Sequence, residues 1–156
     1  NLNTPEASIA QEISLRIRES GRPLKNSSGE TVKNDKGETV KVPGTLKAVK
    51  AMGVFLERFN IAQVSINLVD FETTPPHAAF EEVRKQARSL GTEAIGSEIV
   101  GLTPLSALLM AGRFYAGHAN ADKKNEKELM TLAIEKLGLS QLEPFVPEKK
   151  VIEFML

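Results

Sequence analysis

The chain lacks cysteine and tryptophan, and it contains one tyrosine and two histidines among its 156 residues. Without cysteine, a disulfide framework and a thiolate nucleophile are excluded, and a reducing compartment, with the cytoplasm as the default, is the expected location. A general acid or base with a pKa near neutrality must therefore be His77, His118 or a carboxylate whose pKa is shifted.

The chain also lacks an excess of either charge and has no long apolar run. The 20 basic residues balance the 20 acidic ones, and no run of lysine and arginine is longer than two residues. This predicts neither nucleic acid nor an anionic membrane as a partner. No apolar run approaches the roughly 20 residues that span a bilayer. There is no dinucleotide fingerprint, phosphate-loop lysine, glycine-flanked nucleophilic serine or metal-ligand cluster of plausible spacing.

The segments that are present predict one compact domain with additions. The hydrophobic fraction of 41% is enough for one core. The opening residues Asn1-Leu2-Asn3 resemble the end of a strand that runs into a helix. We therefore expect residues 1–156 to be cut from a longer protein.

Helix starts are marked by threonine before proline, at Thr4-Pro5, Thr74-Pro75 and Thr103-Pro104. The threonine hydroxyl can accept a hydrogen bond from a first-turn amide, and proline has no N–H to leave unpaired there. Apolar residues follow at helical spacing, and glycine ends the first two helices, at Gly21 and Gly91. A fourth helix is predicted from about residue 122 to Gly138. Residues 104–156 are thus expected to form a helical extension and a tail, with a short extended segment at 151–154.

Strands are predicted between and after the first two helices. Residues 46–57 and 61–71 are apolar and are separated by a short polar break, although 46–57 also fits a helix. Residues 94–101 are bounded by glycines and are too short for a helix. With residues 1–3 as the end of a first strand, the order is βαββαβ. The expected fold class is α+β, a ferredoxin-like antiparallel sheet with both helices on one face.

Residues 22–45 differ from the rest because they contain few large apolar side chains. They include a near-repeat, Gly-Glu-Thr-Val-Lys at 29–33 and again at 37–41. With Gly37 in a left-handed conformation, the segment predicts an exposed hairpin insertion. It is either a solvated insertion without a role or a flexible lid over a site.

One strand carries a row of polar side chains. Alternation in residues 61–71 directs Gln63, Ser65 and Asn67 to one face, with Asp70 beyond them, and the apolar residues to the other. Amides and a hydroxyl at alternate positions can bind a heterocycle or an amide edge in a cleft. The alternative is the solvated face of the sheet, or a face that contacts a partner subunit.

Three further features could carry chemistry. The segment 96–104, with Gly96, Ser97, Glu98 and Gly101, offers an approachable backbone and leads into a helix start, where a carboxylate or phosphate could bind. His77, near a helix start where the dipole keeps the ring neutral, is the weak catalytic candidate; the alternative is that it only covers the helix start. His118 is expected to be solvated.

These segments resemble the formiminotransferase family. The similarity is carried by Ile-Ala-Gln-Val-Ser-Ile-Asn-Leu at 61–68 and Gly-Ser-Glu-Ile-Val-Gly-Leu at 96–102. Residues 1–4 are similar to the opening of that family's second subdomain, residues 50–56 to one of its strands, and residues 139–155 to its closing segment. The motifs occur in the family's order and cover most of the chain except 22–45.

The resemblance implies a carboxy-terminal subdomain of an enzyme that moves the formimino group of N-formiminoglutamate to tetrahydrofolate in histidine degradation. It further implies a homodimer, with tetrahydrofolate as co-substrate. The histidine and the glycine segment that the family uses lie in the amino-terminal subdomain, which is absent from this chain, so no catalytic residue is carried over. We expect the polar row of residues 63–67 and the turn at 96–101 to form one wall of the folate and substrate cleft, with His77 and Asp70 near its edge. The remaining alternative is a non-catalytic ferredoxin-like module for ligand binding or dimerisation.

Overall fold

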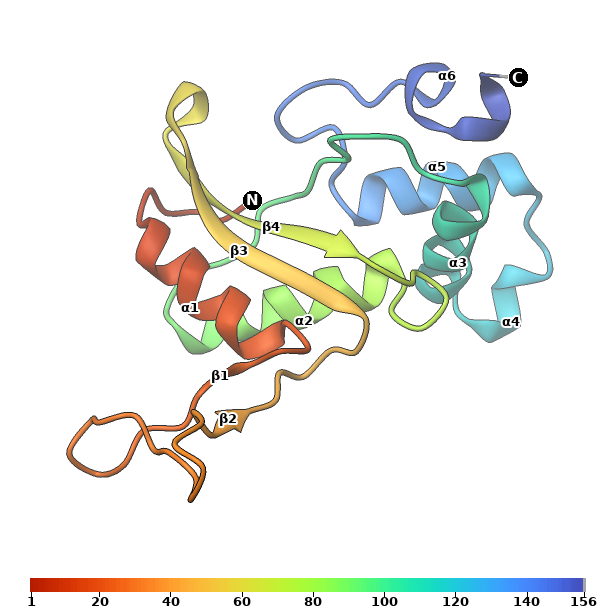
Figure 1. Cartoon of the computed structure of the whole chain (residues 1–156). Helices are drawn as coiled ribbons and strands as arrows, with labels where there is room; N and C mark the ends of the chain where they lie inside the picture. Colours follow the sequence, from red (N-terminus) through yellow and green to blue (C-terminus); the bar gives the residue numbers. More distant parts are fainter. Residues whose placement is uncertain (156) are drawn as a thin grey trace.

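The computed structural model describes residues 1–155 and is an α+β protein, as predicted (Figure 1). The helices and strands follow the chain in this order: α1 (Ala7–Ile17), β1 (Arg22–Pro23), β2 (Lys41–Val42), β3 (Val49–Leu56), β4 (Ile61–Leu68), α2 (Pro76–Ser89), α3 (Leu105–Ala116), α4 (His118–Ala121), α5 (Glu126–Lys136) and α6 (Pro147–Lys150). Short 3₁₀ turns cover Glu57–Phe59 and Ile152–Phe154.

The two long strands form an antiparallel hairpin. Along β3 and β4 every residue from 49 to 56 pairs in regular register, with Met52 opposite Ser65. The reversal is made by the Glu57–Phe59 turn and by Asn60, whose φ of 51° lies in the left-handed region that asparagine tolerates. The predicted pair of adjacent strands is confirmed, and the helical alternative for residues 46–57 is wrong.

Residues 1–4 lie beside β4. The N–H of Leu2 donates to Ala62 O at 2.9 Å, and the N–H of Ala62 donates to Thr4 O at 2.7 Å. On its other side Leu2 forms an antiparallel bridge with Ala94. The spatial order is therefore β3, β4, residues 1–4, then residues 93–95. Within residues 1–155, only β3 with β4 and β1 with β2 are paired as sheets, so the ferredoxin-like arrangement stays a prediction.

The strand predicted over residues 94–101 is wrong beyond Ala94. Ile95 still donates to Asn1 O, at 2.9 Å. From there the segment leaves the sheet, because the N–H of Ser97 donates to Gly138 O at 3.1 Å in the helical extension. A short apolar segment bounded by glycines cannot show whether its backbone pairs with a strand or with another element.

Helix α1 packs on one face of the β3–β4 hairpin, and α2 packs beside α1 (Figure 1). Their inward side chains, with Leu2 and Ala62, form a fully or nearly fully buried core: Ala10, Ile13, Ile17, Val83 and Ala87. Within residues 1–155, α1 therefore covers one face of the hairpin, and the other face carries no helix.

The predicted helix starts are close to the observed ones, but the threonine caps are wrong. Within residues 1–155 no threonine hydroxyl accepts from a first-turn amide of α1, α2 or α3. The Thr4 hydroxyl accepts only from the N–H of Glu6, at 3.2 Å, one residue before α1. The Thr74 hydroxyl instead donates to Lys47 O at 2.7 Å and so ties the start of α2 to the segment before β3. The fourth predicted helix starts at Asn125 with a full capping box to Glu128, rather than at residue 122.

The helical extension has a second core, centred on α3 and α5. Close packing is possible because Gly112 faces the backbone of Leu129; a Cβ there would lie 2.2 Å from Leu129 O. The tail returns to this body through a parallel bridge between Thr103 and Val151. The predicted extended segment at 151–154 is thus limited to Val151, between the helical turns of α6 and Ile152–Phe154.

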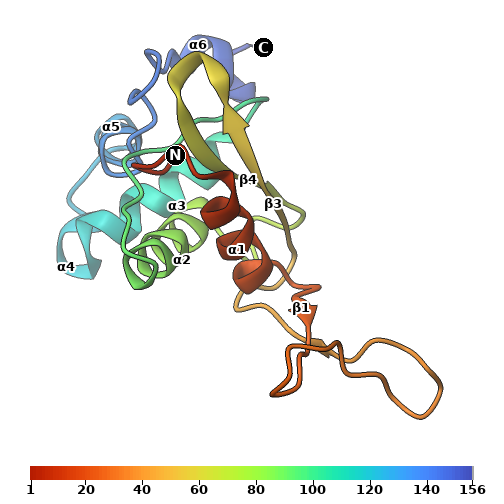
Figure 2. The same ribbon diagram turned by 90° about the vertical axis from the view of Figure 1, so that its left-hand side faces the viewer.

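The insertion is a closed ring of three short segments rather than one hairpin. Leu24 N donates to Val40 O, Val32 N to Leu24 O, and Val40 N to Val32 O, at 2.8, 2.9 and 2.9 Å. Two equivalent loops join the segments, and their glycines, Gly29 and Gly37, have φ of 82° and 79°, which confirms the left-handed prediction. Figures 1 and 2 both show that this ring projects away from the rest of the molecule.

Candidate functional site

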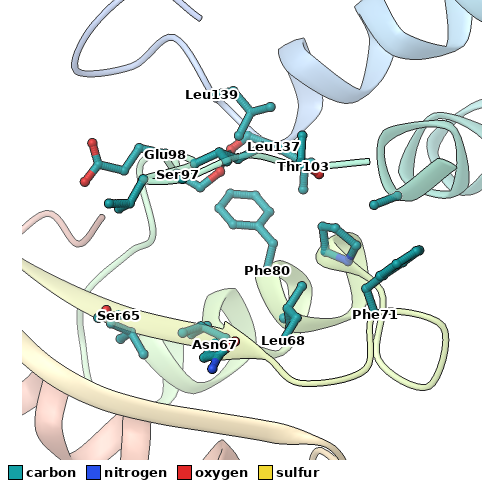
Figure 3. A pocket seen from close by; sticks show the side chains of 18 of the residues that line it. Ser65, Asn67, Leu68, Phe71, Phe80, Ser97, Glu98, Thr103, Leu137 and Leu139 are labelled. Atoms are coloured by element: carbon teal, nitrogen blue, oxygen red, sulfur yellow. Dashed lines mark hydrogen bonds between the residues drawn. The ribbon is translucent and has the colours of Figure 1, made fainter. Parts of the chain in front are cut away.

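A cavity of about 420 Å³ lies between the hairpin and the helical extension. Its walls are β4, the start of α2, and the loop of residues 97–104 that runs into α3 (Figure 3). The two hydrophobic cores lie on either side of it. Strand β4 and the loop, which the sequence analysis expected to share one wall of a cleft, therefore lie on one concave surface, as two of its walls.

The predicted polar row on β4 forms one wall. Gln63, Ser65 and Asn67 all line the cavity, on the strand face that carries no helix. They differ in their surroundings, since Gln63 is 8% exposed and hydrogen-bonded, whereas Asn67 is exposed and no hydrogen bond joins its side chain to residues 1–155. Asn67 is therefore the amide that is free to meet a ligand.

Gln63 holds a small polar network together. Its Nε2 donates to Asn1 Oδ1 at 2.7 Å and to Glu98 Oε1 at 2.9 Å. Asn1 in turn donates from Nδ2 to Gln141 Oε1 at 2.7 Å. The network joins β4, the loop and the helical extension. The role of Asn1 was missed, because a single asparagine at a strand end carries no signal for such a contact.

The glycine-bounded loop forms the opposite wall. Ser97, Glu98 and Gly101 line the cavity, while Gly96 is buried behind them against Gln141. Ser97 is anchored by its hydroxyl, which donates to Leu137 O at 2.6 Å. The loop that the sequence predicted to be approachable is thus brought against the predicted polar row.

The cavity also has apolar walls that the sequence analysis did not identify. Figure 3 shows Phe80 between the loop and β4, and Phe71 at the side beyond Leu68. The helical spacing of Phe80 predicted a core position, and the ring does pack against the second core. Two phenyl rings beside amides are suited to a flat heterocycle, which binds by its face and its polar edge.

Asp70 and His77 do not line the cavity. Asp70 ties the turn before α2, accepting from the Thr73 hydroxyl at 2.6 Å and from the N–H of Glu72 at 3.0 Å. The Thr73 bond is the main cause of a lowered pKa for Asp70. This carboxylate orders a turn at the edge of the site.

His77 packs against the helical extension. Its ring stacks on Phe114 with centroids 4.5 Å apart, and its buried Nδ1 has no hydrogen-bond partner among residues 1–155. Burial lowers the pKa of His77, opposed in part by the carboxylate of Glu81. The ring is therefore neutral near pH 7, as predicted, with burial as the leading cause. His118 is exposed, in agreement with its prediction.

The anion site predicted at the start of α3 is already occupied. The N–H of Leu105 donates to Glu153 Oε2 at 2.8 Å, so a carboxylate of the tail takes this position. The prediction was wrong because the tail, 48 residues further along the chain, could not be placed from the sequence.

Charge is scarce in the cavity. Glu98 is the one ionisable side chain among the described residues that line it. Within residues 1–155 no three potential metal ligands lie close together, and no helix is long and apolar enough to cross a membrane. The described walls therefore offer amides, hydroxyls, backbone groups and aromatic rings to a ligand.

The sequence of this chain matches a known protein family. The formiminotransferase domain family matches residues 1–156, and the chain belongs to this family.

Three relatives illustrate the similarity. The chain is 40% identical over 148 residues to formimidoyltransferase-cyclodeaminase of Gallus gallus, and 41% identical over 147 residues to that of Dictyostelium discoideum. These matches cover 95% and 94% of the chain. Glutamate formimidoyltransferase of Streptococcus pyogenes serotype M1 is 36% identical over 115 residues, or 74% of the chain. The chain spans 24% of the length of the first two relatives and 31% of the third.

Proposed function

We propose that this chain is the carboxy-terminal subdomain of a glutamate formimidoyltransferase. The full-length enzyme, in this proposal, moves the formimino group from N-formiminoglutamate to tetrahydrofolate in histidine degradation, in the cytoplasm. The observation that carries the proposal is the cavity, which unites the two segments that most resemble the family, residues 61–68 and 96–102, on facing walls. The names of the relatives support formimidoyl transfer and, for one of them, glutamate; tetrahydrofolate as the acceptor follows from the family resemblance.

The chemistry makes defined demands on such a site. N5 of the reduced folate attacks the amidine carbon and forms a tetrahedral intermediate. A proton then moves to the glutamate nitrogen, and cleavage of its bond to that carbon releases glutamate. The protein must hold two reactants in contact, and it must donate and accept protons during the transfer.

In this proposal the cavity holds the folate ring. Asn67 and Ser65 meet the polar edge of the heterocycle, and Phe71 and Phe80 contact its faces. Gln63, Ser97 and Glu98 shape the wall through their own hydrogen bonds. Proton transfer is assigned to the upstream subdomain, since neither histidine of this chain lines the cavity.

The upstream subdomain also completes the fold in this proposal. Residues 1–4 already lie between β4 and residues 93–95, which is the order of a ferredoxin-like sheet. The hairpin face without a helix is the surface on which that subdomain would pack. A homodimer of the full-length protein remains a prediction, to be measured by sedimentation.

The proposal is tested by assaying formimino transfer with the chain joined to its upstream half and with the chain alone. We expect transfer only by the joined protein. Calorimetric titration with 5-formyltetrahydrofolate then shows which part binds. Binding without transfer by the joined protein would favour a non-catalytic ligand-binding module, and neither binding nor transfer would refute the proposal.

A further inference from the structure

Lys150 contacts the backbone of residues 99 and 100, which line the cavity, although Lys150 itself does not line it. Its Nζ donates to Ile99 O at 2.7 Å and to Val100 O at 3.1 Å, so one ammonium holds two consecutive carbonyl groups. Lys150 makes no ion pair with a carboxylate in residues 1–155 and does not line the cavity, whereas residues 99–101 do. The carbonyl oxygens therefore point away from the cavity, toward the tail.

The geometry of the peptide bond then fixes where the N–H groups point. In a trans peptide the N–H is directed opposite to the C=O of the same unit, and no peptide bond of residues 1–155 is cis. The N–H groups that pair with the Ile99 and Val100 carbonyls are those of Val100 and Gly101. Neither forms a hydrogen bond with residues 1–155.

We propose that Lys150 positions residues 99–101 so that the N–H groups of Val100 and Gly101 form a binding site for a ligand carboxylate on the cavity wall. Two adjacent backbone N–H groups commonly form an anion-binding site. An ammonium bound to the carbonyls of the same two peptide units polarises them, and this makes their N–H groups stronger donors. This inference rests on the proposed function, because both reactants carry carboxylates. The proposed carboxylate site lies at Val100 and Gly101, and not at the start of α3, which the Glu153 carboxylate occupies.

The tail makes the loop firm enough for this role. Thr103 N donates to Lys150 O at 2.9 Å and Ile152 N to Thr103 O at 3.1 Å, so the backbone of the tail continues the contact made by the ammonium. Neither Gly101 nor its surroundings block access, since a Cβ at Gly101 would meet no atom within 4 Å. The donors are therefore held in place and open to a ligand.

The test uses the full-length protein and compares Lys150→Met, Lys150→Arg and the neighbouring Lys149→Met, whose side chain is exposed and without a hydrogen bond to residues 1–155. Affinities for glutamate and for 5-formyltetrahydrofolate are measured separately by calorimetry, which shows whose carboxylate is bound. A folate analogue without the glutamate moiety is the control ligand. Hydrogen exchange at Val100 and Gly101 is measured with and without each ligand.

We expect Lys150→Met to weaken one of the two carboxylate ligands about ten-fold and to leave the control analogue within about two-fold, because a hydrogen bond to a charged group is of that size. Lys150→Arg should restore the affinity, and Lys149→Met should not change it. In the wild-type protein the bound ligand should slow exchange at Val100 and Gly101, a readout that needs no variant to fold.

Two results would overturn the inference alone: wild-type binding with unchanged exchange at both amides, or equal affinities of Lys150→Met and wild type. A wild-type protein that binds neither ligand would overturn the proposed function together with it.

Discussion

Replacing Gln63 by alanine removes the centre of the network that joins the two walls of the cavity. The Gln63 amide donates to a neutral oxygen of Asn1 and to the carboxylate of Glu98, at 2.7 and 2.9 Å. The side chain is 8% exposed, and Asn1 is equally buried, so water does not freely replace the lost donor at Asn1. The change thus leaves a buried acceptor without its partner.

The magnitude follows from the two bonds. A neutral hydrogen bond contributes about 1 kcal/mol to stability, and a bond to a charged group about 1.5–3 kcal/mol. Glu98 is exposed, so water compensates its loss and the lower value applies. We expect Gln63→Ala to lower the free energy of unfolding by about 2–3 kcal/mol, measured by urea denaturation with circular dichroism.

Asn67→Ala is the matched control. It removes an amide from the same strand face, but that amide is exposed and bonds to no described residue, so stability should change by less than about 0.5 kcal/mol. The effect of Asn67→Ala should instead appear in ligand binding. We expect this variant to weaken folate binding without unfolding the protein.

A charge swap tests the pair itself. Gln63→Glu places two carboxylates together and should destabilise the protein, and adding Glu98→Gln should restore at least half of the loss, because the amide and carboxylate are present again in reversed positions.

If Gln63→Ala stays within about 0.5 kcal/mol of wild type, the network does not hold the walls together and the reasoning is refuted.

Three further predictions concern other parts of the fold. Burial holds the pKa of His77 below 6.5, so at pH values just below 6.5 the unfolded chain binds a proton that the folded chain does not. The free energy of unfolding should therefore fall as the pH drops from 6.5 to the lower, folded pKa. His77→Phe keeps a ring against Phe114 and should remove this pH dependence, measured by denaturation at several pH values. Gly112→Ala should lower stability by about 1–3 kcal/mol in urea, because its Cβ would lie 2.2 Å from Leu129 O; an unchanged midpoint would show that α3 and α5 do not approach so closely. Replacing residues 24–40 by a two-residue turn should change the melting temperature little, since these side chains are mostly exposed, and a large loss would show that the ring supports the body.

Local sequence patterns predicted the features that depend on neighbouring residues, namely β4 and the ends of the main helices. Alternation at residues 61–68 identified β4 and the face that Gln63, Ser65 and Asn67 share. Proline and glycine identified the starts and ends of the main helices within a few residues. In each case the decisive interaction, a hydrogen bond within a helix or the burial of one face, is repeated at regular spacing and therefore visible in the sequence.

Contacts between distant segments were not predictable in this way. Residues 95–101 have the composition of a strand, but their polar groups bond to Asn1, Gly138 and Lys150. Thr74 has the position of a helix cap, but its hydroxyl finds the carbonyl of Lys47. A hydroxyl or amide has one strongest partner among several in reach, and only the tertiary arrangement decides which.

The insertion shows a signal that was present and only partly used. Leu24, Val32 and Val40 lie eight residues apart, and each is followed by lysine. Two copies of the near-repeat, at 29–33 and 37–41, predict one hairpin. Residues 21–25, Gly-Arg-Pro-Leu-Lys, are a third, more divergent copy in the same frame, and its Leu24 closes the ring. Aligning all three copies before assigning a turn would have predicted a repeated unit.

The charge of the cavity connects these observations to the proposed half-site. Both proposed reactants are anionic, yet the described walls carry one carboxylate side chain, Glu98, and no cationic side chain. A carboxylate ligand near Glu98 must be balanced by other groups, because an unpaired charge in a partly closed cavity is costly. Backbone N–H groups oriented by Lys150 supply one such balance within this chain. The remaining positive charge must come from whatever packs on the uncovered face of β3 and β4, which is where the upstream subdomain is proposed to lie.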